Sequence, residues 1–180
     1  MRTFIAAVLL AILPYSLQAT EMCTSGGKVL DEKLGFRDVK FGAAVREIAG
    51  LDQVPQDLYK THRVKAYVRP TDKLEIFDQR LKTITYFFFD DRLFLVDLQW
   101  GGNGALQILE GFRDAFGCEL QRSDGPAGQD LSLLVVGEKV KFYGSVHFPG
   151  IGVYGVAFLQ KLGVQQAVDE AIRREASAQF

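Results

Sequence analysis

Ser145 and His147 come nearest to a catalytic arrangement in this chain. Residues two apart on a strand point to the same face, so the hydroxyl of Ser145 would lie beside the imidazole of His147. A histidine that accepts the proton of a serine hydroxyl is the arrangement used by nucleophilic hydrolases. No G-x-S-x-G turn surrounds Ser145, however, and Lys139 and Lys141 fall on the same strand face. We therefore expect a solvated strand face, and we keep a hydrolase that uses Ser145 and His147 as an alternative.

Other patterns that resemble metal or cofactor sites have simpler explanations. His62 and His147 are the only histidines, and they lack the i, i+4 spacing of a helical metal site. The run 150–155 reads G-x-G-x-x-G, but the apolar residues after it continue as a strand, whereas a dinucleotide site needs a helix there. Asp90, Asp91 and Asp97 surround one hairpin and are interpreted as solubilising residues. We expect no catalytic residues, no metal and no cofactor.

Cys23 and Cys118 are the two cysteines of the chain, and neither belongs to a C-x-x-C motif. A redox-catalytic role is therefore not expected. In an oxidising compartment the two can pair, and the chain-entropy model credits a loop of this length with about 4–5 kcal/mol. The alternative is two separate thiols, with Cys118 as a small buried residue.

The first nineteen residues have the layout of a secretory signal peptide. A positively charged start precedes the apolar run 4–13, Pro14 breaks that run, and small residues precede a cleavage site after Ala19. The run is too short to span a bilayer comfortably, and no second run reaches transmembrane length. We predict a signal peptide at 1–19, a flexible lead-in at 20–35 and one domain at 36–180, with 36–102 and 103–180 as candidate halves. The mature protein is expected in the periplasm or outside the cell, without a transmembrane anchor.

Apolar residues recur with the periods of an antiparallel sheet covered by helices. The spacing predicts helices over 41–49, 105–116 and 164–176, and a helical turn at 55–59. Alternation predicts strands over 62–69, 74–77, 83–89, 92–100, 131–136, 139–148 and 151–160. It places Phe94, Val96, Leu98 and Trp100 on one face. The order indicates an α+β fold of two consecutive helix-then-strands units and a C-terminal helix.

Two segments carry a resemblance to a known family. Residues 41–51 read FGAAVREIAGL, and residues 84–96 read ITYFFFDDRLFLV. The first is similar to the short helix, and the second to the hairpin, of small envelope domains of the β-lactamase-inhibitor-protein-like and outer-membrane assembly lipoprotein type. The hairpin turn here is Asp-Asp where those domains have Asp-Gly, and their lipidated cysteine has no counterpart. The resemblance implies a helix-plus-antiparallel-sheet unit that binds other proteins, and it carries no catalytic residues.

Two strand faces are candidates for binding a partner. Basic residues alternate along 62–69, and polar residues alternate along 139–148. The candidate binding residues on these faces are Arg63, Lys65, Tyr67, Arg69, Lys139, Lys141, Tyr143 and His147. For the basic stretch, the alternative is a solvated edge strand protected by its charges.

The formal net charge of −1 at pH 7 argues against a general nucleic-acid binder. We expect a secreted, non-enzymatic domain that binds another envelope protein. Besides the hydrolase, the remaining alternative is a carrier of a small apolar ligand or lipid. Its cavity would be lined by Phe87, Phe89, Phe94 and Trp100.

Overall fold

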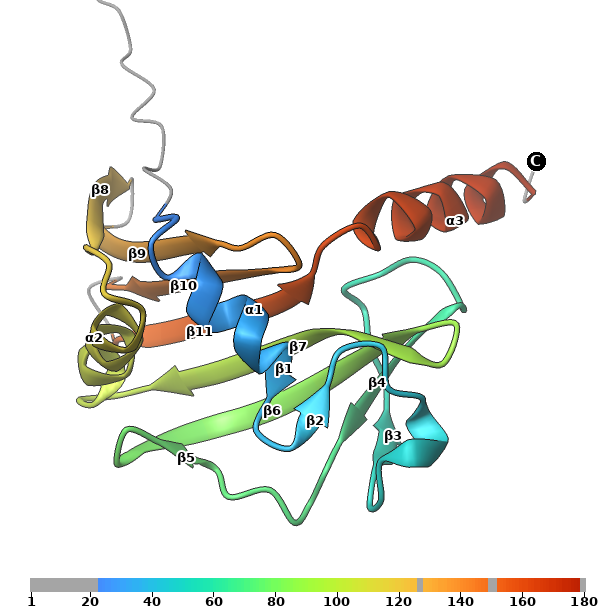
Figure 1. The fold of residues 1–180 in the computed structure, drawn as a ribbon, viewed down its shortest axis with the longest axis horizontal. Coiled ribbons are helices and arrows are strands. Elements are labelled where there is room, and N and C mark those ends of the chain that lie inside the picture. The colour runs from blue at the N-terminus through green and yellow to red at the C-terminus, as the bar shows by residue number, and fades with distance from the viewer. Residues whose placement is uncertain (1–22, 126–127, 149–151, 179–180) are drawn as a thin grey trace, which may run out of the picture.

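The computed structural model describes residues 23–125, 128–148 and 152–178. The signal peptide predicted at 1–19 and its cleavage site lie outside this part of the chain. The described residues form an α+β fold in which helices pack on a large antiparallel sheet, as the periodicity predicts (Figure 1).

The sheet has the strand order β3-β4-β6-β7-β11-β10-β9-β8 (Figure 1). Its strands are β3 (Asp52–Val54), β4 (Val64–Val68), β6 (Gln79–Phe89), β7 (Arg92–Gly101), β8 (Gln121–Gly125), β9 (Gly128–Val136), β10 (Val140–His147) and β11 (Tyr154–Lys161). The short β5 (Glu75–Ile76) pairs with β6, and β1 (Gly35–Phe36) pairs with β2 (Val39–Lys40) in a separate ribbon. Pairing of β7 with β11 joins the strands of both halves into one sheet.

Helix α2 (Ala105–Phe116) lies on the main core of the molecule. Its apolar residues recur three and four apart, so they form one stripe along the helix. This stripe packs on the face of the sheet that carries Trp100, Phe142 and Leu159. The helix ends where Gly117 adopts a left-handed φ of 64° and returns its N–H to the last turn, as the sequence predicts.

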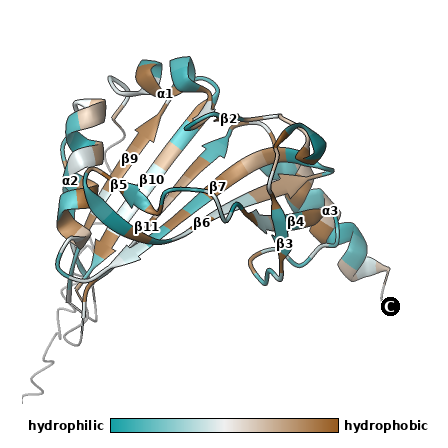
Figure 2. Cartoon of the chain, turned by 90° about the horizontal axis from the view of Figure 1, so that it is seen from below, coloured by the Kyte–Doolittle hydropathy of each residue, from teal (hydrophilic) through white to brown (hydrophobic). Residues whose placement is uncertain are grey.

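Helix α3 (Gln165–Ser177) lies at the opposite end of the sheet from α2 (Figure 2). Its buried residues Val168 and Ala171 belong to a second apolar cluster. The sheet residues of this cluster are Val64, Ala66, Phe87, Phe89, Phe94 and Leu95, and Tyr59 closes it with edge-on contacts to Phe87 and Phe94. The sheet is therefore covered on one face by α2 and, at its other end, by α3 on the opposite face.

A bulge in β7 changes the expected assignment of its faces. Phe87 pairs with Leu95 and Phe88 with Leu93, so Phe94 is the extra residue on its strand. Phe94 therefore points with Leu95 toward α3, whereas Val96 lies in the α2 core. Placing Phe94 with Val96, Leu98 and Trp100 is wrong because strict alternation does not survive the bulge.

The expected helix at 41–49 is reduced to the 3-10 turn η1 (Val45–Glu47). Backbone groups of this segment are bonded to the neighbouring hairpin instead: the N–H of Gly42 donates to Leu93, and the N–H of Leu93 donates to Ala43. At 55–59 no helical turn forms either, because the Gln56 side chain bonds both the N–H and the C=O of Tyr59.

The expected flexible lead-in at 20–35 contains the helix α1 (Gly27–Lys33) in its described part. A disulfide joins Cys23 to Cys118, with 5.9 Å between their Cα atoms. The backbone of Cys23 also bonds to Leu134 and Val136 at the side of β9. Covalent and backbone bonds thus hold this segment against the sheet, which its polar composition does not reveal.

Candidate binding face

The face of β9, β10 and β11 opposite α2 is left uncovered by α1 and α2, and of its described residues only Phe158 at its border packs against the cluster under α3. We call it the open face and define it by three cross-strand rows. The rows are Asp130–His147–Tyr154, Ser132–Ser145–Val156 and Leu134–Tyr143–Phe158. Helices α1 and α2 pack over the other face of these strands, and α3 lies over β4, β6 and the start of β7 (Figure 2).

The open face carries apolar and aromatic side chains that are only partly buried. Leu134, Tyr143, Val156 and Phe158 are half-buried, and Tyr154 is 46% exposed. An antiparallel sheet with one face on the core usually carries polar residues on the other. The aromatic side chains of this face depart from that pattern.

Ser145, His147 and Asp130 form a hydrogen-bonded chain on the open face. The Oγ of Ser145 lies 3.0 Å from Nε2 of His147, and Nδ1 of His147 lies 3.1 Å from Oδ1 of Asp130. The ring of Tyr154 stacks on the imidazole with 4.8 Å between centroids. Sequence spacing predicts that Ser145 and His147 share a face, but it misses Asp130, which only the β9–β10 register brings to His147.

This chain has the order of a serine-hydrolase triad but lacks two of its requirements. Ser145 is only 1% exposed, so its hydroxyl is closed to a substrate carbonyl. It also lies in the middle of a strand paired on both sides, and amides engaged in sheet bonds cannot serve as an oxyanion hole. The geometry supports a role in fixing the orientation of His147 and Tyr154 better than a role in catalysis.

The basic residues in and directly before β4 are already paired within the protein. Arg63 binds both carboxylate oxygens of Asp90 and lies over the ring of Phe89, and Lys65 contacts Asp91 at 3.0 Å. Tyr67 is buried against Phe88. Of the residues expected to form a basic binding strand, these three are committed to internal contacts.

Arg69 belongs to a partly buried ionic network. It bridges Asp38 at 2.7 Å and Asp72 at 2.6 Å, and the hydroxyl of Tyr86 donates to Asp72 at 2.6 Å. The hydrogen bonds from Arg69 lower the pKa of Asp38 to about 2. The network connects the β1–β2 ribbon to the sheet. Because the guanidinium of Arg69 is bonded within this network, it offers little surface to a partner.

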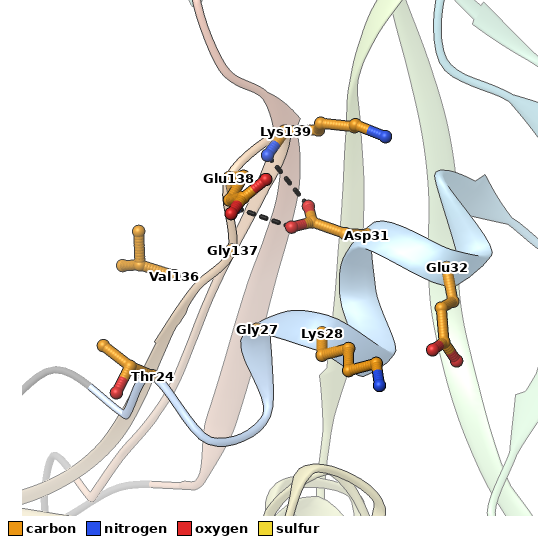
Figure 3. A pocket seen from close by; sticks show the side chains of 9 residues that line it. All are labelled: Thr24, Gly27, Lys28, Asp31, Glu32, Val136, Gly137, Glu138 and Lys139. Atoms are coloured by element: carbon orange, nitrogen blue, oxygen red, sulfur yellow. Dashed lines mark hydrogen bonds between the residues drawn. The ribbon is translucent and has the colours of Figure 1, made fainter.

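The two lysines of the other predicted surface lie in different places. Lys141 is half-buried on the open face, between Val136 and Gln160. Lys139 is exposed and lines a groove of about 810 Å³ between α1 and the β9–β10 turn (Figure 3). Of the polar residues expected along β10, Lys141, Tyr143 and His147 therefore share the open face.

Asp31 of α1 closes one side of this groove by binding the β9–β10 turn (Figure 3). Its carboxylate accepts hydrogen bonds from the backbone N–H groups of Glu138, Lys139 and Val140, at 2.6, 2.9 and 3.0 Å. Partial burial raises the pKa of Asp31, but the three N–H donors outweigh it and lower the pKa below its ordinary value. The three N–H groups of this turn are thus occupied by the Asp31 carboxylate rather than free to bind another anion.

Asp97 is buried in β7 rather than exposed near the hairpin turn as expected. It is 6% exposed, accepts a hydrogen bond from Gln99 at 2.9 Å through Oδ2, and has no partner for Oδ1 within the described part of the chain. Burial raises the pKa of this carboxyl. The sequence gives no sign of it, because an aspartate in an alternating strand is ordinarily solvent-facing.

The four aromatic residues expected to line one ligand cavity do not share a face. Phe87, Phe89 and Phe94 are packed under α3, whereas Trp100 lies in the α2 core, where its Nε1 donates to the carbonyl of Ala105 at 2.9 Å. All four are buried. They belong to two cores on opposite faces of the sheet. The single cavity lined by all four, on which the carrier alternative depends, is therefore not formed by these residues.

Across residues 23–125, 128–148 and 152–178, three or more metal-binding side chains nowhere gather into a site. None of the helices in these ranges has the length and apolarity needed to cross a membrane. Comparison with protein-family models, curated proteins and solved structures finds no match for this chain. The function must therefore be argued from the open face itself.

Proposed function

We propose that this protein is a secreted, non-catalytic binding domain that attaches to another protein of the cell envelope through its open face. The observation that carries the proposal is the open face, on which Leu134 and Tyr143 are half-buried and Tyr154 is 46% exposed. Phe158 lies at its border, where it packs against the cluster under α3. Aromatic residues in a partly apolar patch with a polar surround are typical of the centre of a protein interface. Ser132 and Asp130 supply that surround on one side.

The proposed location rests on two observations. The first nineteen residues have the layout of a signal peptide, and the Cys23–Cys118 disulfide is compatible with an oxidising compartment. The resemblance of residues 84–96 to the hairpin of small envelope domains implies the same kind of function, since those domains bind other proteins, whereas residues 41–51 form a 3-10 turn in place of the helix of those domains.

The test is to capture partners in the envelope with and without an intact open face. Cells produce the tagged wild type, Tyr143→Glu or the matched control Leu58→Glu, and bound proteins are identified by mass spectrometry after crosslinking. Leu58 is 55% exposed and lies outside the open face, so its variant adds the same charge elsewhere. We expect one dominant partner that is lost with Tyr143→Glu and kept with Leu58→Glu. A partner kept by both variants, or none with the wild type, contradicts the proposal.

A hydrolase is the second candidate, because Asp130, His147 and Ser145 are connected in triad order. A fluorophosphonate probe, which labels activated serines, distinguishes it from a binding domain. The buried hydroxyl of Ser145 predicts no labelling. Labelling that disappears in Ser145→Ala, with folding unchanged, would make the hydrolase the better account.

A further inference from the structure

The two ends of the sheet differ in how they are protected. At one end β3 has three residues and is followed by Pro55, features that prevent a further strand from pairing. At the other end β8 has five residues and contains no proline (Figure 1). It pairs with β9 on one side only, and no other strand of the described chain lies against its second edge.

The sequence of β8 is complementary to itself in the antiparallel direction. It reads Gln-Arg-Ser-Asp-Gly, so a twofold axis at Ser123 sets Arg122 of one copy opposite Asp124 of the other. Arg122 and Asp124 are each one residue from Ser123 and therefore share a sheet face. Both side chains are exposed, and neither forms an ion pair in the described part of the chain.

Charge also selects this alignment over its neighbours. A shift of one copy by two residues keeps the same backbone groups at the shared edge. In one direction it sets Arg122 opposite its own copy, and in the other it sets Asp124 opposite its own copy. Like charges directly across a strand pair are unfavourable, whereas opposite charges are favourable. The two-residue spacing also directs the backbone groups of Arg122 and Asp124 to the same edge of the strand, as ladder pairing requires.

We infer that β8 is a dimerisation edge, on which a second copy of this chain adds its own β8 in antiparallel pairing centred on Ser123. The twofold axis of such a pair stands perpendicular to the sheet, so equivalent faces of both copies point to the same side. The two open faces then lie side by side on one continuous sheet. The inference does not depend on the proposed function, but it would double the surface on which that function acts.

The test is the oligomeric state of the purified, disulfide-bonded protein, measured by sedimentation over a range of concentrations. We expect a monomer–dimer equilibrium that Arg122→Glu or Asp124→Arg each weakens roughly tenfold or more, because the symmetry repeats every contact. The double variant Arg122→Glu/Asp124→Arg restores opposite charges and is expected to recover the dimer. Circular dichroism shows whether each variant is folded.

A second variant tests the alignment directly. Ser123→Cys places two thiols opposite each other at the axis, so mild oxidation is expected to link two copies through this position. The control Leu58→Cys carries an equally accessible thiol away from β8. A wild type that stays monomeric overturns the inference, as does a dimer that both single charge reversals leave unchanged. Loss of partner binding with Tyr143→Glu leaves the dimer unaffected, so the two proposals fail separately.

Discussion

At the scale of single residues, Asp97 is an unfavourable feature of the described part of the chain. A carboxyl group that is almost fully buried, with one oxygen unpaired, loses the hydration that stabilises its charge. Burial therefore raises its pKa in the folded state above that of the unfolded chain. The folded state binds the proton more tightly than the unfolded chain does. The stability contributed by protonated Asp97 is therefore present at low pH and is lost as the pH rises through the folded-state pKa.

Asp97→Asn removes this charge while keeping an oxygen that can accept from Gln99. We expect the free energy of unfolding of Asp97→Asn, relative to the wild type, to increase by about 1 kcal/mol between pH 4 and pH 7. Urea unfolding at both pH values measures it, with the exposed Asp52→Asn as control. If the difference in the free energy of unfolding between Asp97→Asn and wild type does not change with pH, burial does not destabilise the charged form of Asp97.

At the scale of elements, the sequence predicts those whose own residues repeat regularly. The helix at 105–116 is confirmed, because its apolar period of 3.6 persists along it. The hairpin of 83–89 with 92–100 is also confirmed, although the bulge at Phe94 interrupts its period of 2. The helix expected at 41–49 fails because Gly42 and Ala43 bond to β7. The two-residue turn between β6 and β7 forms without glycine, because Asp90 and Asp91 adopt left-handed φ values of 48° and 58°.

Helix α1 packs on the sheet through Leu30, and its Asp31 carboxylate binds the β9–β10 turn. Asp31→Ala leaves three N–H groups of the β9–β10 turn without their acceptor, so we expect a loss of about 1 kcal/mol at neutral pH. Since the hydrogen bonds lower the pKa of Asp31, this stabilisation is present above its unfolded pKa and lost as the pH falls through the folded-state value.

Hydrogen exchange of the Glu138, Lys139 and Val140 amides measures this effect locally. The control is Glu32→Ala, because this neighbouring acidic residue accepts no hydrogen bond from the turn amides in the described part of the chain. Faster exchange at these amides in Asp31→Ala alone supports the account. Equal exchange in both variants would mean that the turn is held without Asp31.

At the scale of the whole molecule, the disulfide closes a loop of 95 residues that contains α1, β1–β7 and α2. Cys23→Ser/Cys118→Ser is expected to reduce the free energy of unfolding by about 4–5 kcal/mol, in the chain-entropy model. Urea unfolding with and without reductant measures the change. The double variant should not respond to reductant, and a wild type equally indifferent to it would contradict this role of the bond.

The open face is a property of the whole molecule, because three strands form it. Sequence alternation places Lys141, Tyr143, Ser145 and His147 on one face, and the structure agrees. It could not show that Asp130, Leu134 and Phe158 join them, since strand register depends on the turns and the shared core. It also could not show that Arg63, Lys65 and Arg69 are neutralised, because their partners come from other elements.

The most direct test of the central claim is to ask which face of the folded protein touches its partner in the envelope. A photo-crosslinking amino acid is placed at Tyr143 on the open face, at Leu58 outside it, and at Lys65 on the paired basic strand. The account predicts one crosslinked protein of defined mass from position 143 and none from positions 58 and 65. Crosslinking from 58 or 65 but not from 143 would contradict the claim that the open face is the binding surface.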